Sequence, residues 1–212
     1  DLKLQRTVAI KVLRPDFAGV VGPRRFLREI EIASTLSHPH IIPVHDSGEA
    51  DGLLWYAMPY VEGESLHARL KREQQLPLGL AVRLARESAD ALEYAHARRI
   101  VHRDIKPENV LLQGGHAVVT DFGIARAFTE GADATRLTST GVVVGTPQYM
   151  SPEQGAGERE VDARTDVYSL GCVLYEMLVG EPPFTGASVR AVVARHVSQP
   201  PPSMRLVRPE VP

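Results

Sequence analysis

Three polar side chains at fixed spacing constrain this chain more than any other feature of its sequence. Asp104 and Asn109 lie five residues apart in the run VHRDIKPENV at 101–110, and Asp121 follows Asp104 by seventeen residues at the start of an Asp-Phe-Gly run. A connection of that length accommodates a β-hairpin that returns the chain beside the first loop. Phosphoryl transfer needs a carboxylate to receive the proton of the attacking hydroxyl and oxygen ligands for Mg²⁺, and this window contains both.

Each of these motifs has an ordinary structural explanation when it stands alone. His-Arg-Asp is short, an Asp-Phe-Gly turn can be only a turn, and Asn109 can end a turn or cap a helix. Chance explains them poorly together, because Lys11 in the run VAIK lies far upstream and Ser-Pro-Glu lies downstream at 151–153. In this order the motifs resemble those of the eukaryotic-like serine/threonine protein kinase family, and the resemblance covers nearly the whole chain.

The resemblance implies an α+β fold of the bilobal protein-kinase type, with a small β-rich N-lobe and a mainly α-helical C-lobe. The partial N-lobe is expected at 1–60, the interlobe hinge at 61–63, and the partial C-lobe at 64–212, with the activation segment at 121–153. Both lobes are expected to be incomplete, since the family's Gly-rich loop would precede the first residue and its last helices would follow the last one.

The same resemblance assigns roles to the residues of the central motifs. Asp104 is expected to orient the substrate hydroxyl and take its proton, and Lys106 to neutralise charge on the transferring phosphoryl group. Asn109 and Asp121 are expected to ligate Mg²⁺ or Mn²⁺ through oxygen atoms. Lys106 is also the residue type that serine/threonine-specific members carry here, and the sequence around 150–154 is similar to the bacterial branch.

Nucleotide binding is expected to use residues from the first sixty positions and the central hairpin. Lys11 would hold the α- and β-phosphates of ATP, positioned by Glu29. Because Glu29 lies on or beside the apolar stripe of a predicted helix, it either pairs with Lys11 or flanks the stripe and extends to water. The pocket and hinge residues that would surround adenine are Ala9, Met58, Tyr60, Val61 and Leu111.

Hydrophobic periodicity and turn residues predict the surrounding elements. Helices are expected over 23–36, 80–98 and 166–179, and strands over 7–13, 41–46, 53–60, 110–112 and 117–120. The last helix is apolar nearly all round, which predicts burial. His102 and Phe122 are expected to pack rather than catalyse, and Cys172 to be a buried structural residue.

Residues 124–150 show no strong period and are rich in Thr, Ser and Gly, as in a loop. The family resemblance predicts that Thr138 and Thr140 are phosphorylated by a second copy of the kinase, and that Arg103 pairs with the added phosphate. The alternative is that both are ordinary loop threonines. Thr146 is expected to contact Asp104 instead.

Composition narrows the partners and the compartment. A net charge of −2 argues against nucleic acid as a partner, and a single cysteine excludes an internal disulfide. Protein substrates with Ser or Thr acceptors are expected. No apolar run has membrane-spanning length, so this domain is expected in the cytoplasm, with a plasma-membrane anchor left open for the full-length protein.

Two other functional classes compete with a protein kinase. A pseudokinase or signalling scaffold would share the fold, but all catalytic positions are present here. A small-molecule phosphotransferase of similar fold would not need the Gly-Thr-Pro run at 145–147 or the Ser-Pro-Glu run at 151–153. The protein kinase is therefore the preferred hypothesis.

Overall fold

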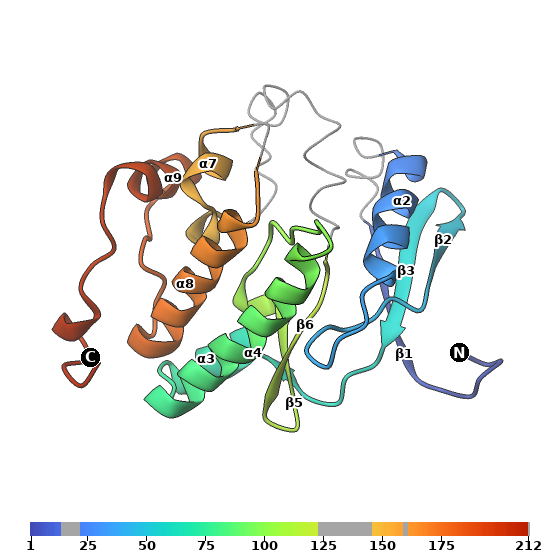
Figure 1. Cartoon of the computed structure of the whole chain (residues 1–212), viewed down its shortest axis with the longest axis horizontal. Coiled ribbons are helices and arrows are strands. Elements are labelled where there is room, and N and C mark those ends of the chain that lie inside the picture. Colours follow the sequence, from blue (N-terminus) through green and yellow to red (C-terminus); the bar gives the residue numbers. More distant parts are fainter. Residues whose placement is uncertain (14–21, 123–145, 159–160, 212) are drawn as a thin grey trace.

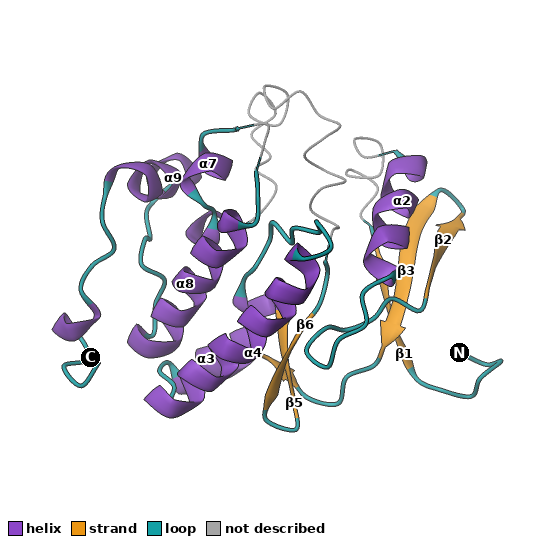
Figure 2. Ribbon diagram, in the orientation of Figure 1, coloured by secondary structure: helices purple, strands orange, loops and turns teal. Residues whose placement is uncertain are grey.

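The computed structural model of the chain describes residues 1–13, 22–122, 146–158 and 161–211. Strands and one helix gather in the N-terminal part, whereas most helices lie in the C-terminal part (Figures 1 and 2). The strands are β1 (Val8–Val12), β2 (Asp46–Ala50), β3 (Leu53–Pro59), β4 (Glu64–Ser65), β5 (Val110–Gln113) and β6 (His116–Val119). The α-helices are α2 (Pro23–Ser34), α3 (Leu66–Glu73), α4 (Leu78–His96), α7 (Pro152–Gly155), α8 (Arg164–Val179) and α9 (Val189–Ser198). Short 3₁₀ turns are η1 (Pro107–Asn109), η2 (Pro147–Tyr149) and η3 (Met204–Leu206).

The N-terminal sheet is antiparallel, with the strand order β1-β3-β2. Side chains alternate between its two faces, so Ile10 and Val12 of β1 are exposed on one face. Ala9 and Lys11 point to the opposite face, where they lie across from Met58 and Tyr56 of β3. The inner face of this sheet therefore carries both apolar and charged groups.

Helix α2 covers the N-terminal sheet (Figure 1). Pro23 occupies the first turn, where its missing N–H costs nothing. Phe26, Ile30 and Ala33 recur at helical spacing and are buried. Phe26 and Ile30 pack toward the apolar side chains of β3, which fixes the helix on the sheet.

A second antiparallel sheet, ordered β4-β5-β6, carries the central hairpin. An isolated parallel bridge between Ile41 and Val119 connects it to the segment between α2 and β2. The N–H of Ile42 donates to the carbonyl oxygen of Val119 at 2.9 Å, and the N–H of Val119 donates to that of His40 at 2.8 Å. These two hydrogen bonds fasten the N-terminal region to the hairpin.

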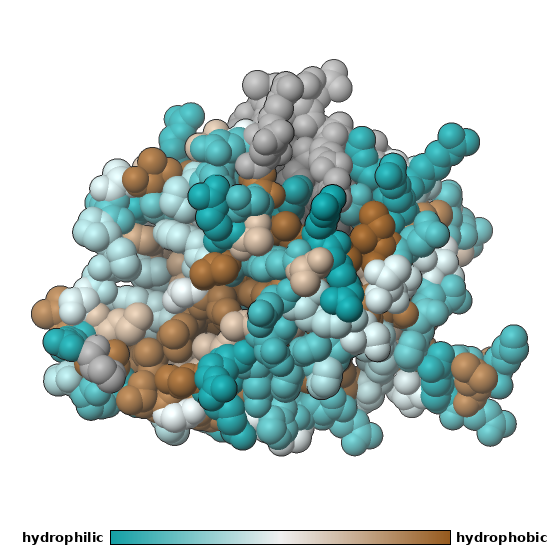
Figure 3. Space-filling model, in the orientation of Figure 1, coloured by the Kyte–Doolittle hydropathy of each residue, from teal (hydrophilic) through white to brown (hydrophobic). Residues whose placement is uncertain are grey.

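The largest core lies between α4, α8 and the β5–β6 hairpin. On the face shown in Figure 3, hydrophobic side chains gather in the region of α4 and α8. Helix α8 ends at Gly180, whose φ of 97° is the left-handed C-cap conformation that glycine adopts without strain. Cys172 on this helix is buried, and burial raises the pKa of its thiol to about 12.

Most predicted elements are confirmed within a few residues, but the strand predicted at 41–46 is wrong. Pro43 has no N–H to donate to a ladder, and the neighbouring Ile41 and Ile42 bond to the central hairpin instead. The strand that pairs with β3 begins only at Asp46. The predictions also omitted β4, α3, α7 and α9, as well as the 3₁₀ turns η1, η2 and η3.

Candidate active site

The loop before β5 brings Asp104, Lys106 and Asn109 together. The Nζ of Lys106 lies 2.7 Å from Oδ2 of Asp104. The amide nitrogen of Asn109 donates to the backbone oxygen of Asp104 at 2.8 Å and to its Oδ2 at 3.1 Å. Pro107 opens the 3₁₀ turn that places Asn109 beside Asp104. A carboxylate, a cation and an amide oxygen therefore share one short loop.

The fully buried carboxylate of Asp166, in the first turn of α8, accepts hydrogen bonds from the backbone of this loop. Asp166 Oδ2 accepts from the N–H of His102 at 2.8 Å, and Oδ1 accepts from the N–H of Arg103 at 2.7 Å. His96 Nε2 lies 2.7 Å from the same Oδ2. Arg103 has a φ of 66°, a left-handed conformation that costs energy for a non-glycine residue. The bonds to Asp166 oppose that cost immediately before Asp104.

His102 connects the loop with the residue that precedes Asp121. Its ring is fully buried, its Nε2 lies 2.9 Å from the carbonyl oxygen of Thr120, and its Nδ1 accepts from the N–H of Asp104 at 3.2 Å. The ring also packs edge-on against Phe122, with centroids 4.7 Å apart. These contacts fit the packing roles expected for His102 and Phe122.

Asp121 lies just beyond β6 and is contacted from the N-terminal sheet. Its φ is 69°, again left-handed. Lys11 Nζ forms an ion pair with Oδ2 of Asp121. The hydroxyl of Tyr56 donates to Oδ1 at 2.5 Å, and that of Thr120 donates to the same oxygen at 3.2 Å. Asp121 therefore joins the hairpin to β1 and β3.

The structure pairs Lys11 with Asp121, a carboxylate that the sequence analysis did not name as its partner. The predicted partner was Glu29. Lys11 lies opposite Tyr56 in the β1–β3 register, and Tyr56 bonds to Asp121, so Asp121 is within reach of the lysine. Glu29 on α2 is only 6% exposed, which excludes the alternative that it extends to water. Its pairing with Lys11 stays a prediction.

Four of the five residues expected around adenine lie in one apolar cluster. Met58 is buried within it, and Ala9, Val61 and Leu111 pack against it. Tyr60 is 57% exposed, just after the end of β3. The sheet and the hairpin therefore bring side chains from distant parts of the sequence to a common apolar region.

The donor set of the predicted metal site consists of one amide and one carboxylate. The nitrogen of Asn109 bonds to Asp104, which leaves its amide oxygen as the ligand atom. Within the described ranges, no three or more His, Cys, Asp or Glu side chains form a group that could hold a metal. The side chains of Asn109 and Asp121 offer an amide oxygen and a carboxylate, the oxygen donors that Mg²⁺ or Mn²⁺ takes, and an ion held by them would need further oxygen ligands such as nucleotide phosphates and water.

Most of the predicted activation segment, including Thr138 and Thr140, lies outside the described residues. Thr146 is described, and the hydrogen bonds of the described residues include none between Thr146 and Asp104. Directly after the segment, the side chain of Gln154 donates to the carbonyl oxygen of Arg103 at 2.8 Å. Ser151 caps α7 and accepts from the hydroxyl of Thr165 at 2.6 Å.

A buried acid–phenol pair fixes the turn after Thr146. The hydroxyl of Tyr149 donates to Oε2 of Glu176 at 2.5 Å. Burial raises the pKa of the Glu176 carboxyl, while the hydrogen bond from Tyr149 opposes this shift. The pair joins η2 to the last turn of the buried helix α8.

Sequence reasoning missed four side chains that organise the site, namely Tyr56, His96, Gln154 and Asp166. The one available signal was Asp166, a carboxylate at the start of a helix that is otherwise apolar nearly all round. The other three belong to elements whose sequence pattern is explained by ordinary surface or core positions.

Comparison with known proteins identifies the class of this fold and site. Residues 2–209 match the family model described as protein kinase domain. The chain belongs to the protein kinase family, and the predicted α+β fold, with a sheet-rich N-terminal and a helical C-terminal region, is confirmed. In the described residues, no helix has both the length and the hydrophobicity that crossing a membrane requires.

Its relatives include mycobacterial serine/threonine-protein kinases. The chain is 46% identical to PknB of Mycobacterium leprae over 97% of its own length and 34% of the relative. It is 42% identical to PknD of Mycobacterium tuberculosis over 99% of its length and 31% of that protein. The chain thus spans about a third of the length of these curated relatives. The crystal structure of a mutant form of the Mycobacterium tuberculosis PknI kinase domain superimposes with a TM-score of 0.72 at 35% identity, covering 96% of this chain and 71% of that one.

Proposed function

We propose that the protein carrying this chain is an ATP-dependent serine/threonine protein kinase that transfers the γ-phosphate to hydroxyls of protein substrates. The observation that carries the proposal is the loop in which Asp104 contacts both Lys106 and Asn109. This loop is tied through Thr120 to Asp121, since the N–H of Thr120 donates to the carbonyl oxygen of Asn109 at 3.0 Å. The carboxylate of Asp104, proposed to act on the acceptor hydroxyl, and that of Asp121, proposed to act on the nucleotide phosphates, are thereby held on one scaffold.

In the proposed reaction, the acceptor oxygen bonds to the γ-phosphorus of ATP while the bond from that phosphorus to the β–γ bridging oxygen breaks, and ADP leaves. Asp104 accepts the hydroxyl hydrogen and takes the proton. Lys106 lies against the carboxylate of Asp104, where its charge can offset the negative charge of the phosphoryl oxygens.

Nucleotide binding is proposed to use the inner face of the N-terminal sheet. Lys11 would hold the α- and β-phosphates, and the apolar group of Ala9, Met58, Val61 and Leu111 would receive adenine. Pro59 has no N–H, so the hinge donor is expected at Val61. When bound, Mg²⁺ or Mn²⁺ neutralises charge on the phosphates, and Asn109 and Asp121 would hold it through their side-chain oxygens.

The preference for Ser and Thr rests on Lys106 and on the relatives, which are named serine/threonine-protein kinases. We assign the domain to the cytoplasm, because its proposed co-substrate is ATP and its lone cysteine forms no internal disulfide.

Regulation is proposed to act through phosphorylation of Thr138 and Thr140 by a second copy of the kinase. Arg103 would receive the phosphate, because a guanidinium pairs well with phosphate oxygens and this one directly precedes Asp104. The test is mass spectrometry of an Asp104→Asn copy after incubation with an active copy. Phosphate on Thr138 or Thr140 is expected, and phosphate confined to residues outside 124–150 would contradict the proposal.

Two isosteric variants of the full-length protein separate the proposed catalytic roles. Asp104→Asn should lower kcat by about 10²–10⁴-fold, the range for loss of a general base, with nucleotide affinity unchanged. Asp121→Asn should weaken nucleotide binding in the presence of Mg²⁺. The control is Asp90→Asn, an exposed carboxylate on α4, which should change neither quantity.

Phosphate transfer is measured on a protein substrate, and binding is measured by calorimetry with a non-hydrolysable ATP analogue. An Asp104→Asn variant with parental turnover would refute the proposed role of Asp104 as general base. A parent that binds nucleotide but transfers no phosphate would favour the pseudokinase or scaffold instead.

A further inference from the structure

Tyr56 is a buried tyrosine on the central strand of the N-terminal sheet. Its side chain shares the inner face of the sheet with Lys11, since the two residues are direct partners across β1 and β3. Only 6% of Tyr56 is exposed, and its ring lies against Phe26 of α2 with centroids 6.4 Å apart. The helix and the strand pairing thus fix where the phenol hydroxyl lies.

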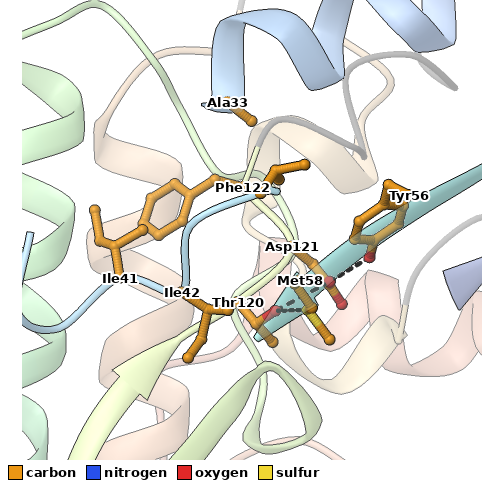
Figure 4. Close-up of a pocket in the computed structure, with 9 residues that line it drawn as sticks. Ala33, Ile41, Ile42, Tyr56, Met58, Thr120, Asp121 and Phe122 are labelled. Carbon is orange, nitrogen blue, oxygen red and sulfur yellow. Dashed lines mark hydrogen bonds between the residues drawn. The ribbon is translucent and has the colours of Figure 1, made fainter. Parts of the chain in front are cut away.

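The hydroxyl of Tyr56 reaches the carboxylate of Asp121. Figure 4 shows Tyr56 extending from β3 toward Asp121, with Thr120 and Met58 beside it. Oδ1 of Asp121 accepts from the hydroxyl of Tyr56 at 2.5 Å and from that of Thr120 at 3.2 Å. Lys11 pairs with the other oxygen, Oδ2. Both carboxylate oxygens of Asp121 therefore have side-chain partners.

The hydroxyl is the part of Tyr56 that packing does not explain. A phenylalanine would fill the same apolar space beside Phe26, and a buried hydroxyl is costly unless it finds a partner. The hydroxyl of Tyr56 finds its partner in Oδ1 of Asp121, to which it donates at 2.5 Å.

We infer that Tyr56 is a positioning residue for the metal ligand Asp121, acting through the hydrogen bond from its hydroxyl to Oδ1. This inference rests on the proposed function, in which Asp121 binds Mg²⁺. A carboxylate can rotate about its Cβ–Cγ bond, and a fixed donor on one oxygen selects the rotation that presents the remaining lone pairs to the ion. Such partners of metal ligands typically change metal affinity or activity 10–100-fold when removed.

The rigid surroundings of Tyr56 add to this effect. Because Phe26 belongs to α2, the ring of Tyr56 lies between α2 and Asp121. Thr120 is a weaker substitute, since its hydroxyl is also within 3.4 Å of the sulfur of Met58 and makes the longer contact with Asp121. Among the described residues, Tyr56 thus makes the shortest hydrogen bond from an uncharged donor to Oδ1 of Asp121.

The test is the Tyr56→Phe variant of the full-length kinase, which removes one oxygen atom and keeps the ring. A Mg²⁺ titration measures how the affinity for a non-hydrolysable ATP analogue depends on the metal, and the same binding is measured without metal. The Mg²⁺ concentration at half-effect should rise about tenfold in the variant, with metal-free binding unchanged. Tyr94→Phe is the matched control, because its hydroxyl accepts from the N–H of Ser37, away from the site.

The outcomes separate this inference from the proposed function. An unchanged or lower Mg²⁺ requirement in Tyr56→Phe overturns the positioning role, even when the parent transfers phosphate normally. If the nucleotide affinity of the parent does not depend on Mg²⁺, both the positioning role and the proposed function are overturned. Should Tyr56→Phe not fold, as judged by circular dichroism, Phe26→Leu replaces it; this variant keeps the hydroxyl but removes the ring that fixes it. A raised Mg²⁺ requirement supports the role, and an unchanged one overturns it.

Discussion

Replacing Asp166 by Asn tests whether this buried carboxylate holds the catalytic loop. The substitution keeps the size of the side chain but turns one acceptor oxygen into an NH₂ group. Oδ1 accepts from Arg103 and Oδ2 from His102, so the NH₂ group must face a backbone N–H in either orientation. One of these two buried N–H groups therefore loses its acceptor.

The expected cost follows from these contacts. A buried donor left unsatisfied costs about 1–3 kcal/mol, and the remaining bonds lose about 1 kcal/mol of charge assistance. The free energy of unfolding should therefore fall by about 3 kcal/mol. At about 2–4 °C per kcal/mol for a domain of this size, the Tm should fall by about 6–12 °C.

The assay is thermal unfolding followed by circular dichroism on the kinase domain with and without the substitution. Asp162→Asn is the matched control: this aspartate lies four residues earlier, is exposed, and pairs with Arg164. It should leave the Tm unchanged. The reasoning is refuted if Asp166→Asn unfolds at the parental temperature, or if both variants lose the same amount.

Three further predictions concern the C-terminal core and the glycines. Burial raises the pKa of Glu176, so its contribution to stability is full below about pH 4.5 and is lost as pH rises through the raised pKa. The Tm of Glu176→Gln, measured relative to that of the parent, should therefore rise between about pH 5 and about pH 8. Cys172, with a pKa of about 12, should resist iodoacetamide in the native protein and react after unfolding, as mass spectrometry would record; rapid native labelling would contradict its burial. A Cβ on Gly63 would lie 2.1 Å from the carbonyl oxygen of Leu112, so Gly63→Ala should destabilise the fold in denaturant titrations. Gly171 lies on α8 with open space around its Cβ position, so Gly171→Ala should stabilise the fold by about 1 kcal/mol.

The sequence predicted the parts of the fold that follow from local pattern. The long helix α4 and the buried helix α8 have clear periodicity, and both were found within two residues of their ends. The strand expected at 41–46 failed because an apolar, β-branched run was preferred over the signal of Pro43. Helix α3 is short and half of its residues are charged, and α9 has only ten residues, so their pattern alone did not separate them from loops.

The candidate site divides in the same way. Asp104, Lys106 and Asn109 are neighbours in sequence, so their spacing already predicted their proximity. The contact between Tyr56 and Asp121 spans 65 residues, and that between Asp166 and His102 spans 64. Nothing in the local sequence encodes such a contact, because it depends on how the sheet and the helices pack.

The hydrogen bonds of His40 and Ile42 with Val119 fasten the N-terminal region to the hairpin, so they would be the pivot of any rotation of helix α2. They restrain the chain just beyond the C-terminal end of α2, whereas the opposite end of the helix lies about 18 Å away along its axis. A rotation of about 10° about this point would move the Pro23 end by about 3 Å and Glu29 by roughly half as much. Any rotation of α2 about this point would therefore displace the buried carboxylate of Glu29 and, through Phe26, press on the ring of Tyr56.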